Sequence, residues 1–300
     1  MYDTSSTSVL STVQHTTPVL DTAYSGDGSV LAGATLGGEV SIADVGSVVA
    51  QPSVVLGSPS SGEALSSIEY VGSANAFVAG GWDASVSLWD PRAVSRVGST
   101  SGPGKVYALA VSGHRVVVGC AGRHVYVYDV RNMAEPEQRR ESSLKHQTRS
   151  VATSPDGASF AVSSIEGRVS IEYFDMDPAV QKQKFAFKCH RTKADPVAGT
   201  SAVAYPVNAL AFHPKLATLA TGGADGAVNV WDPKYKRKLA VFGPFQTSIA
   251  ALAFSPDGAS LALASSYTFE LGERDSPQDA IFIRSVIDAE FKSKGPKKRR

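Results

Sequence analysis

The segment GGWDASVSLWD at residues 80–90 returns in nearly the same form as GGADGAVNVWD at residues 222–232. Six of the eleven positions are identical. The Gly pair is suited to end one strand, Asp with small residues favours a tight turn, and the alternating apolar residues predict a second strand. Each copy therefore predicts a strand–turn–strand unit that closes with Trp-Asp.

Weaker copies of this phrase lie in phase with the first two: GGEVSIAD at 37–44, GRHVYVYD at 122–129 and EGRVSIEY at 166–173. Closing Asp residues at 44, 90 and 129 are spaced by 46 and 39, which brackets the WD-repeat period of roughly 40–45 residues. A further apolar run precedes most copies, at 19–24, 64–70, 106–111, 207–212 and 249–254. Since no helical period competes, we predict an all-β fold, a WD-repeat β-propeller.

Six repeats can be placed, at about 13–50, 60–95, 103–140, 145–180, 203–240 and 247–287. They predict one propeller domain over 1–290 and a basic, disordered tail over 291–300. Residues 175–205 are expected to form a long loop, a kind of segment that is often functional. Met1-Tyr2-Asp3 has the shape of a strand end that closes a blade. We therefore expect seven blades with the first one missing here; the alternative is a true six-bladed protein.

Composition narrows the class of protein. The chain has 300 residues, of which 43% are hydrophobic, enough for one large core. Its two cysteines, Cys120 and Cys189, fall in separate repeats, so we expect a reducing compartment and no disulfide framework. No apolar stretch reaches roughly 18 residues and the first residues do not resemble a signal peptide, so neither a membrane segment nor secretion is predicted.

Charge is unevenly placed along the chain. The net charge is +1, but six basic residues and no acidic one lie in 292–300, which leaves the remainder at −5. An acidic body argues against a broad nucleic-acid-binding surface, because such a surface needs clustered Lys and Arg. The sequence KKRR at 297–300 is either a nuclear-import signal or a solvated terminus.

No motif predicts catalysis, a cofactor or a metal. GSTSGPGKV at 98–106 resembles a phosphate-binding loop, but five residues separate the outer glycines and Val106 replaces the required Ser or Thr. Cys189 and His190 lack further ligands at the spacing of a zinc site. We therefore expect a protein that is not an enzyme, with His190 and His213 serving the fold.

Three motifs are more specific than the repeat itself: RRESSLKHQTR at 139–149, SSIEGRV at 163–169 and VQKQKFAFKCHR at 180–191. With these motifs, the chain from about residue 14 to 289 closely resembles the family of the third Bub protein, the WD-repeat component of the mitotic spindle checkpoint. A sister family, the WD-repeat messenger-RNA export factor of the nuclear pore, shares some of the same elements and is the alternative. The arginine-rich first motif and the VQKQK run favour the checkpoint family.

This resemblance implies an adaptor. It would bind a short acidic segment of checkpoint kinases (the GLEBS motif) and phosphorylated Met-Glu-Leu-Thr motifs of a kinetochore scaffold. The inhibitor assembly of the anaphase-promoting complex is a further implied partner. The implied location is the nucleus, with the kinetochore in mitosis and the cytoplasm in interphase.

The resemblance also assigns a peptide- and phosphate-binding site to Arg149, Arg168, Lys182, Arg191 and Trp82. Guanidinium groups form forked, charge-assisted bonds with carboxylates and phosphates, and an indole packs well on an apolar side chain of a peptide. Two of these assignments have structural alternatives. Arg168 would instead pair with a neighbouring carboxylate, and Trp82 would instead pack within a blade, as we expect of Trp89 and Trp231.

Overall fold

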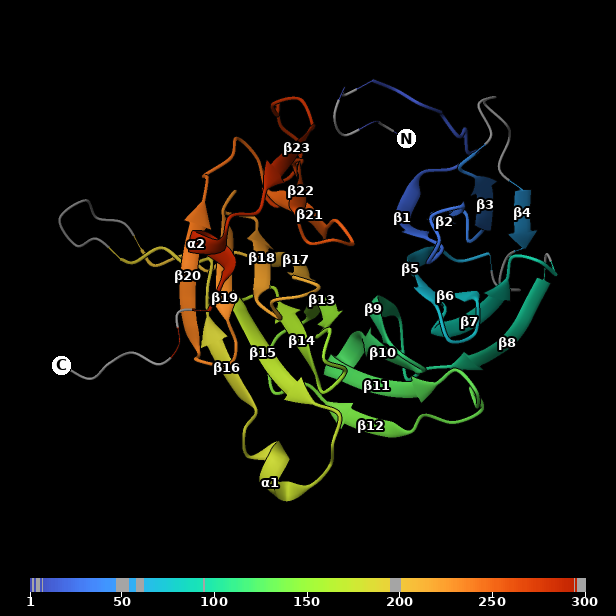
Figure 1. Ribbon diagram of the computed structural model, residues 1–300, viewed down its shortest axis with the longest axis horizontal. Helices are drawn as coiled ribbons and strands as arrows, with labels where there is room; N and C mark the ends of the chain where they lie inside the picture. Colours follow the sequence, from blue (N-terminus) through green and yellow to red (C-terminus); the bar gives the residue numbers. More distant parts are fainter. Residues whose placement is uncertain are drawn as a thin grey trace. The chain divides into compact units, whose positions relative to one another are not determined.

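The computed structural model describes residues 1, 3, 6, 8–46, 54–57, 62–93, 95–194, 201–293 and 295 (Figure 1). The chain forms two compact units, Met1–Ser142 and Ser143–Arg300. The KKRR sequence at 297–300 lies outside the described residues, as does the 195–200 part of the expected loop. Within the described ranges, no helix has the length and apolar character needed to cross a membrane.

The first unit contains three four-stranded antiparallel sheets, and in each sheet the strands lie in chain order. The first sheet consists of β1 (Val19–Tyr24), β2 (Val30–Thr35), β3 (Val40–Asp44) and β4 (Val54–Gly57). The second consists of β5 (Leu65–Val71), β6 (Ala76–Gly81), β7 (Ser85–Asp90) and β8 (Ser95–Ser101). The third consists of β9 (Val106–Ser112), β10 (Arg115–Cys120), β11 (His124–Asp129) and β12 (Gln138–Glu141).

The second unit repeats this arrangement. The fourth sheet consists of β13 (Thr148–Thr153), β14 (Ser159–Ser164), β15 (Arg168–Tyr173) and β16 (Phe185–Lys188). The fifth consists of β17 (Val207–Phe212), β18 (Leu219–Gly223), β19 (Val228–Asp232) and β20 (Arg237–Phe242). The sixth has three strands among the described residues, β21 (Ile249–Phe254), β22 (Ser260–Ser265) and β23 (Ala280–Ser285). Six sheets, one for each repeat, confirm the predicted all-β propeller fold.

Three glycines of the repeated phrase lie where neighbouring segments of the same unit pack closely on the strand. A Cβ atom on Gly80 would lie 2.5 Å from Val106, and one on Gly222 would lie 2.4 Å from Ile249. A Cβ atom on Gly223 would lie 2.3 Å from the His190 ring. Gly80 and Gly222 therefore allow the first strand of the next sheet to pack directly on this strand, and Gly223 leaves room for the His190 ring.

The rest of the phrase forms the turn that was predicted. Asp83 accepts a hydrogen bond from the backbone N–H two residues later (2.9 Å), and Asp225 does the same (3.1 Å). Ala84 and Gly226 follow with φ of 70° and 72°. The side chain of Trp89 is buried and its indole N–H donates to Ser87 (2.8 Å). The turn and the closing strand are thus fixed by local hydrogen bonds.

Two segments differ from the expectations. Residues 175–205 were expected to form a loop, but they contain the short helix α1 (Pro178–Gln181) and β16, the outer strand of the fourth sheet. Met1 and Asp3 lie outside the strands: the Met1 carbonyl accepts from Leu10 N–H (3.0 Å), and Asp3 N–H donates to Ser8 (2.9 Å). A second short helix, α2 (Asp288–Phe291), follows β23 and buries Phe291.

Candidate functional site

Three of the predicted basic residues share one end of the fourth sheet. We call the end at which the first strand of a sheet begins its top end, and the other its bottom end. Thr148 pairs with Ser164, and Arg168 pairs with Ser164 and Lys188. Arg149 at the start of β13, Arg168 at the start of β15 and Arg191 just after β16 therefore all lie at the top end.

The Glu166 carboxylate lies close to three basic side chains at this end. Its carboxylate lies 3.2 Å from Arg168 Nε, 3.9 Å from Arg191 Nη2 and 3.3 Å from His146 Nε2. The structural alternative for Arg168, a neighbouring carboxylate, is thus present in the fold. Arg191 also donates to the backbone carbonyl of Gly167 (Nε to O, 3.2 Å). One carboxylate faces two guanidinium groups, so positive charge exceeds negative charge here.

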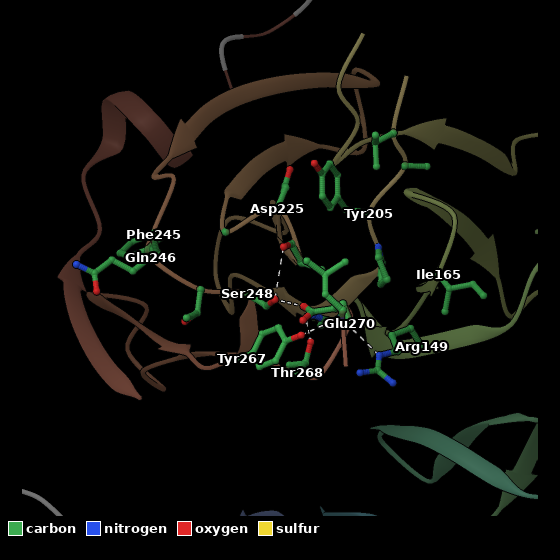
Figure 2. A pocket seen from close by; sticks show the side chains of 18 of the residues that line it. Arg149, Ile165, Tyr205, Asp225, Phe245, Gln246, Ser248, Tyr267, Thr268 and Glu270 are labelled. Carbon is green, nitrogen blue, oxygen red and sulfur yellow. Dashed lines mark hydrogen bonds between the residues drawn. The ribbon is translucent and has the colours of Figure 1, made fainter. Parts of the chain in front are cut away.

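A cavity of about 720 Å³ opens at the same end of the second unit. Arg149 lines it and donates from Nε to the side chain of Asn208 (3.1 Å). Figure 2 shows Arg149 and Ile165 on one side of the cavity and Phe245 and Gln246 on the other. The lining combines two arginines, two carboxylates (Asp225 and Glu270) and several apolar and aromatic side chains. Such a lining suits a peptide that carries both acidic and apolar residues.

A buried hydrogen-bond network positions Arg191. His190, whose side chain is fully buried, contacts the Asp225 carboxylate through Nδ1 (2.8 Å) and the Thr221 hydroxyl through Nε2 (2.8 Å). Because a carboxylate only accepts, Nδ1–H is the donor to Asp225. Trp231 Nε1–H donates to the same hydroxyl (3.2 Å). These bonds fix the chain immediately before Arg191 and confirm that His190 and Trp231 serve the fold.

A segment after β22 supplies the remaining wall of the cavity. The Glu270 carboxylate accepts hydrogen bonds from the Ser248 hydroxyl and from the Thr268 hydroxyl (2.6 Å). The Arg274 guanidinium lies 4.5 Å from the centre of the Tyr267 ring. Sequence reasoning missed these residues, because the segment matches no repeat phrase. Its position before a repeat's third strand was the only available signal.

The side chains at the top end of the second unit are suited to binding a ligand. Burial raises the pKa of the nearby Cys189 thiol to about 12, so this group is not a ready nucleophile. The described part of the chain contains no group of three or more His, Cys, Asp or Glu side chains suited to a metal ion. Guanidinium groups beside an apolar cavity provide charge-assisted hydrogen bonds and a pocket for one or two apolar side chains.

Of the other two predicted site residues, Lys182 lies at the opposite end of the fourth sheet and Trp82 belongs to the other unit. Lys182 follows α1 and precedes β16, at the bottom end of the fourth sheet. The five steps along β15 separate the two ends by about 17 Å. Trp82 belongs to the first unit, in the turn between β6 and β7, where Lys105 Nζ lies 5.6 Å from its ring centre. Within the second unit, the structure therefore places the three arginines at one end of the fourth sheet and Lys182 at the other.

Comparison with known proteins identifies the repeat and the relatives. The family model described as WD domain, G-beta repeat, matches residues 199–232. A chain from a structure described as "Crystal Structure of Mitotic Checkpoint Complex" matches with a TM-score of 0.69, covering 90% of this chain and 79% of that one. Its sequence identity is 16%, so this match establishes the shared fold.

Proteins found by sequence comparison share a higher sequence identity with this chain than that solved structure does. "Mitotic checkpoint protein BUB3.1" of Arabidopsis thaliana is 46% identical over 98% of this chain and 85% of its own length. "Mitotic checkpoint protein bub-3" of Caenorhabditis elegans is 43% identical over 77% of this chain and 68% of its own length. "Protein RAE1" of Arabidopsis thaliana is 37% identical over 68% and 57%. From the extent of the first two matches, we conclude that the chain belongs to the Bub3 family of WD-repeat mitotic checkpoint proteins.

Proposed function

We propose that this chain is a non-enzymatic adaptor of the mitotic spindle assembly checkpoint. It binds a GLEBS-type acidic segment of checkpoint kinases and phosphorylated Met-Glu-Leu-Thr motifs of a kinetochore scaffold. The observation that carries the proposal is the top end of the second unit, where Arg149 lines a cavity with apolar and aromatic walls, and Arg168 and Arg191 lie at the same end of the fourth sheet. The names of the relatives support a role in the same checkpoint.

In this proposal, the position of Glu166 explains why a phosphate binds at the arginines. Its carboxylate pairs with the charges of Arg168 and Arg191, but Arg168 Nε has no hydrogen-bond acceptor among the described residues, and Arg191 Nη2 lies 3.9 Å from the carboxylate, too far for a hydrogen bond. A phosphate carries up to two negative charges and three acceptor oxygens, so it would supply the acceptor that Arg168 Nε lacks in the described structure and more negative charge than the single carboxylate. The apolar cavity would then hold the neighbouring Met or Leu side chain. Phosphorylation thus adds the contacts that an uncharged Thr lacks.

The proposed cellular setting follows from this role. An adaptor that joins kinases to a kinetochore scaffold works at the kinetochore in mitosis, and in interphase it resides in the nucleus or cytoplasm. Checkpoint kinases would deliver it to the inhibitor assembly of the anaphase-promoting complex. Each of these partners would bind through a short peptide, which a propeller face accommodates without a large conformational change.

The decisive test is peptide titration of Arg191→Ala. A hydrogen bond to a charged group contributes about 1.5–3 kcal/mol, so affinity for the phosphorylated scaffold peptide should fall roughly tenfold to a hundredfold. Affinity for the unphosphorylated peptide should fall less. Arg131→Ala is the matched control, because Arg131 is 69% exposed and pairs with Asp129 in the first unit. Equal losses for both peptides would mean that Arg191 shapes the site without reading phosphate.

Two further experiments test the position of Lys182 and the choice between the checkpoint and the messenger-RNA export roles. Since Lys182 lies at the bottom end, Lys182→Ala should leave phosphopeptide affinity within about twofold of wild type. Affinity purification from mitotic cells should recover checkpoint kinases and a kinetochore scaffold. Recovery of nuclear pore proteins and messenger ribonucleoprotein in their place would favour the export alternative.

A further inference from the structure

A second cavity lies at the bottom end of the second unit, away from the proposed checkpoint site. It measures about 300 Å³ and is lined by β16 and by the end of β19 with the turn that follows. Phe185 and Phe187 project from the same face of β16, and Phe187 packs on Trp231 with 4.4 Å between ring centres. These rings are only partly buried. The cavity is therefore an apolar groove between the outer strand of one sheet and the next sheet.

Lysines surround this groove. Lys182 and Lys184 precede β16, while Lys234, Lys236 and Lys238 lie on the β19–β20 turn and on β20. All five are exposed, and none has a carboxylate within 4.0 Å among the described residues. Nζ of Lys236 lies 4.5 Å from the ring centre of Phe185. The positive charge at the rim thus has no partner in the described chain.

The groove also contains donors and an acceptor that are not used. Nε and Nη2 of Arg237 are buried with no hydrogen-bond acceptor among the described residues, and Arg237 lines the groove. The Asp232 side chain is 3% exposed, and its Oδ2 accepts no hydrogen bond in the described structure. Arg237 Nε and Asp232 Oδ2 are 3.9 Å apart, too far for a hydrogen bond. Buried groups of this kind normally have partners, so a ligand at this position would satisfy them.

A neighbouring cavity of about 610 Å³ extends the groove. The two cavities share Asp232, Pro233 and Lys236, and the larger one is also lined by Lys182, Lys234 and one further carboxylate, Asp156. A ligand that runs from one to the other would therefore pass along several lysines in succession. An extended peptide has the length to do so, at about 3.3 Å per residue.

We propose that this groove, defined by Phe185, Phe187, Trp231 and Arg237, docks an acidic peptide segment of a protein partner. One apolar side chain of the peptide fills the smaller cavity, carboxylates face the lysines, and a peptide carbonyl or carboxylate accepts from Arg237. The observations favour a peptide over a nucleic acid, because Phe187 and Trp231 pack on each other and Lys236 lies over Phe185. Base stacking needs an open ring face. The proposal is independent of the top-end site.

The test begins with a displayed library of random 12-residue peptides, selected on the full chain. Acidic sequences with a single large apolar residue should be enriched. An enriched peptide, labelled with fluorescein, is then titrated by fluorescence anisotropy against wild type and against the double variant Lys182→Glu, Lys238→Glu. Reversal of two exposed charges should weaken binding by about tenfold or more. Lys145→Glu, at an exposed lysine of the top end, is the matched control and should change affinity less than twofold.

Two further measurements separate the alternatives. Phe185→Leu should weaken binding while the melting temperature, recorded in parallel, reports any loss of folding. A peptide without its apolar residue should lose most of its affinity. Selected peptides whose binding responds to Arg191→Ala but not to the lysine reversals would overturn the proposal. So would an unstructured 12-nucleotide oligomer that binds the groove more tightly than any selected peptide.

Discussion

Replacement of His190 by Ala tests whether the buried network holds the top-end site together. The substitution removes the contacts of His190 with Asp225 and Thr221, both 2.8 Å, so each of these two polar groups loses one buried hydrogen bond. Losing a bond to a charged group costs about 1.5–3 kcal/mol, and losing a neutral one costs about 1 kcal/mol. We therefore expect the free energy of unfolding of the second unit to fall by about 2.5–4 kcal/mol. The melting temperature should fall by roughly 6–15 °C.

The assay is urea unfolding followed by Trp fluorescence, with thermal melting in parallel. His114→Ala is the control, because the His114 side chain is 39% exposed and lies 3.7 Å from Asp129 in the first unit, so we expect a loss of less than about 0.5 kcal/mol. The double variant with Asp225→Asn should cost less than the two single changes added together, since both remove the same bond. A loss below about 1 kcal/mol for His190→Ala, or strict additivity, would refute the reasoning.

Three further predictions concern other parts of the chain. Burial raises the pKa of Asp21 to about 6 and that of Glu69 to about 8. Because these carboxyl groups favour the folded state only while they are protonated, the free energy of unfolding of the first unit should fall as the pH rises from about 4 to about 8. Glu69→Gln should make this fall with pH smaller, as measured by urea titration at several pH values. Burial raises the pKa of both thiols, Cys120 and Cys189, to about 12, so iodoacetamide should label them in urea but not in the native protein; rapid native labelling would contradict this. Gly167 has φ of 64°, and an added Cβ would lie 2.6 Å from a backbone carbonyl. Gly167→Ala should therefore destabilise the turn before Arg168 by about 1–3 kcal/mol and weaken phosphopeptide binding. An unchanged free energy of unfolding would show that an alanine fits this turn without strain.

The repeated phrase could predict the fold because its residues act locally. Asp225 closes its own turn, and Gly226 adopts the positive φ that the turn requires. Gly222 was also recognisable, although the reason for it lies in the next sheet, where Ile249 occupies the space of a Cβ atom. Each of these features repeats with the period of the chain. A single sequence therefore contains several independent copies of the same information.

The outer strands and the cavity wall were harder to predict. β16 is only four residues long and follows a run of Gln and Lys, so its alternation of Phe185 and Phe187 was too short to recognise. The segment with Tyr267 and Glu270 has no repeat phrase, and its side chains reach the cavity through contacts with residues distant in sequence, such as Ser248. Such contacts depend on how sheets pack, which a local pattern does not record.

The separation of Lys182 from the arginines has a simple geometrical cause. In an antiparallel sheet the chain reverses at every turn, so residues one strand apart in sequence lie at opposite ends. Arg168 begins β15 at the top end, Lys182 lies beyond its bottom end, and Arg191 follows β16 back at the top. Basic residues within one motif series are therefore divided between two surfaces. The position within the repeat, and not proximity in sequence, decides which cations can meet the same ligand, and this places Lys182 with the lysines of the bottom-end groove.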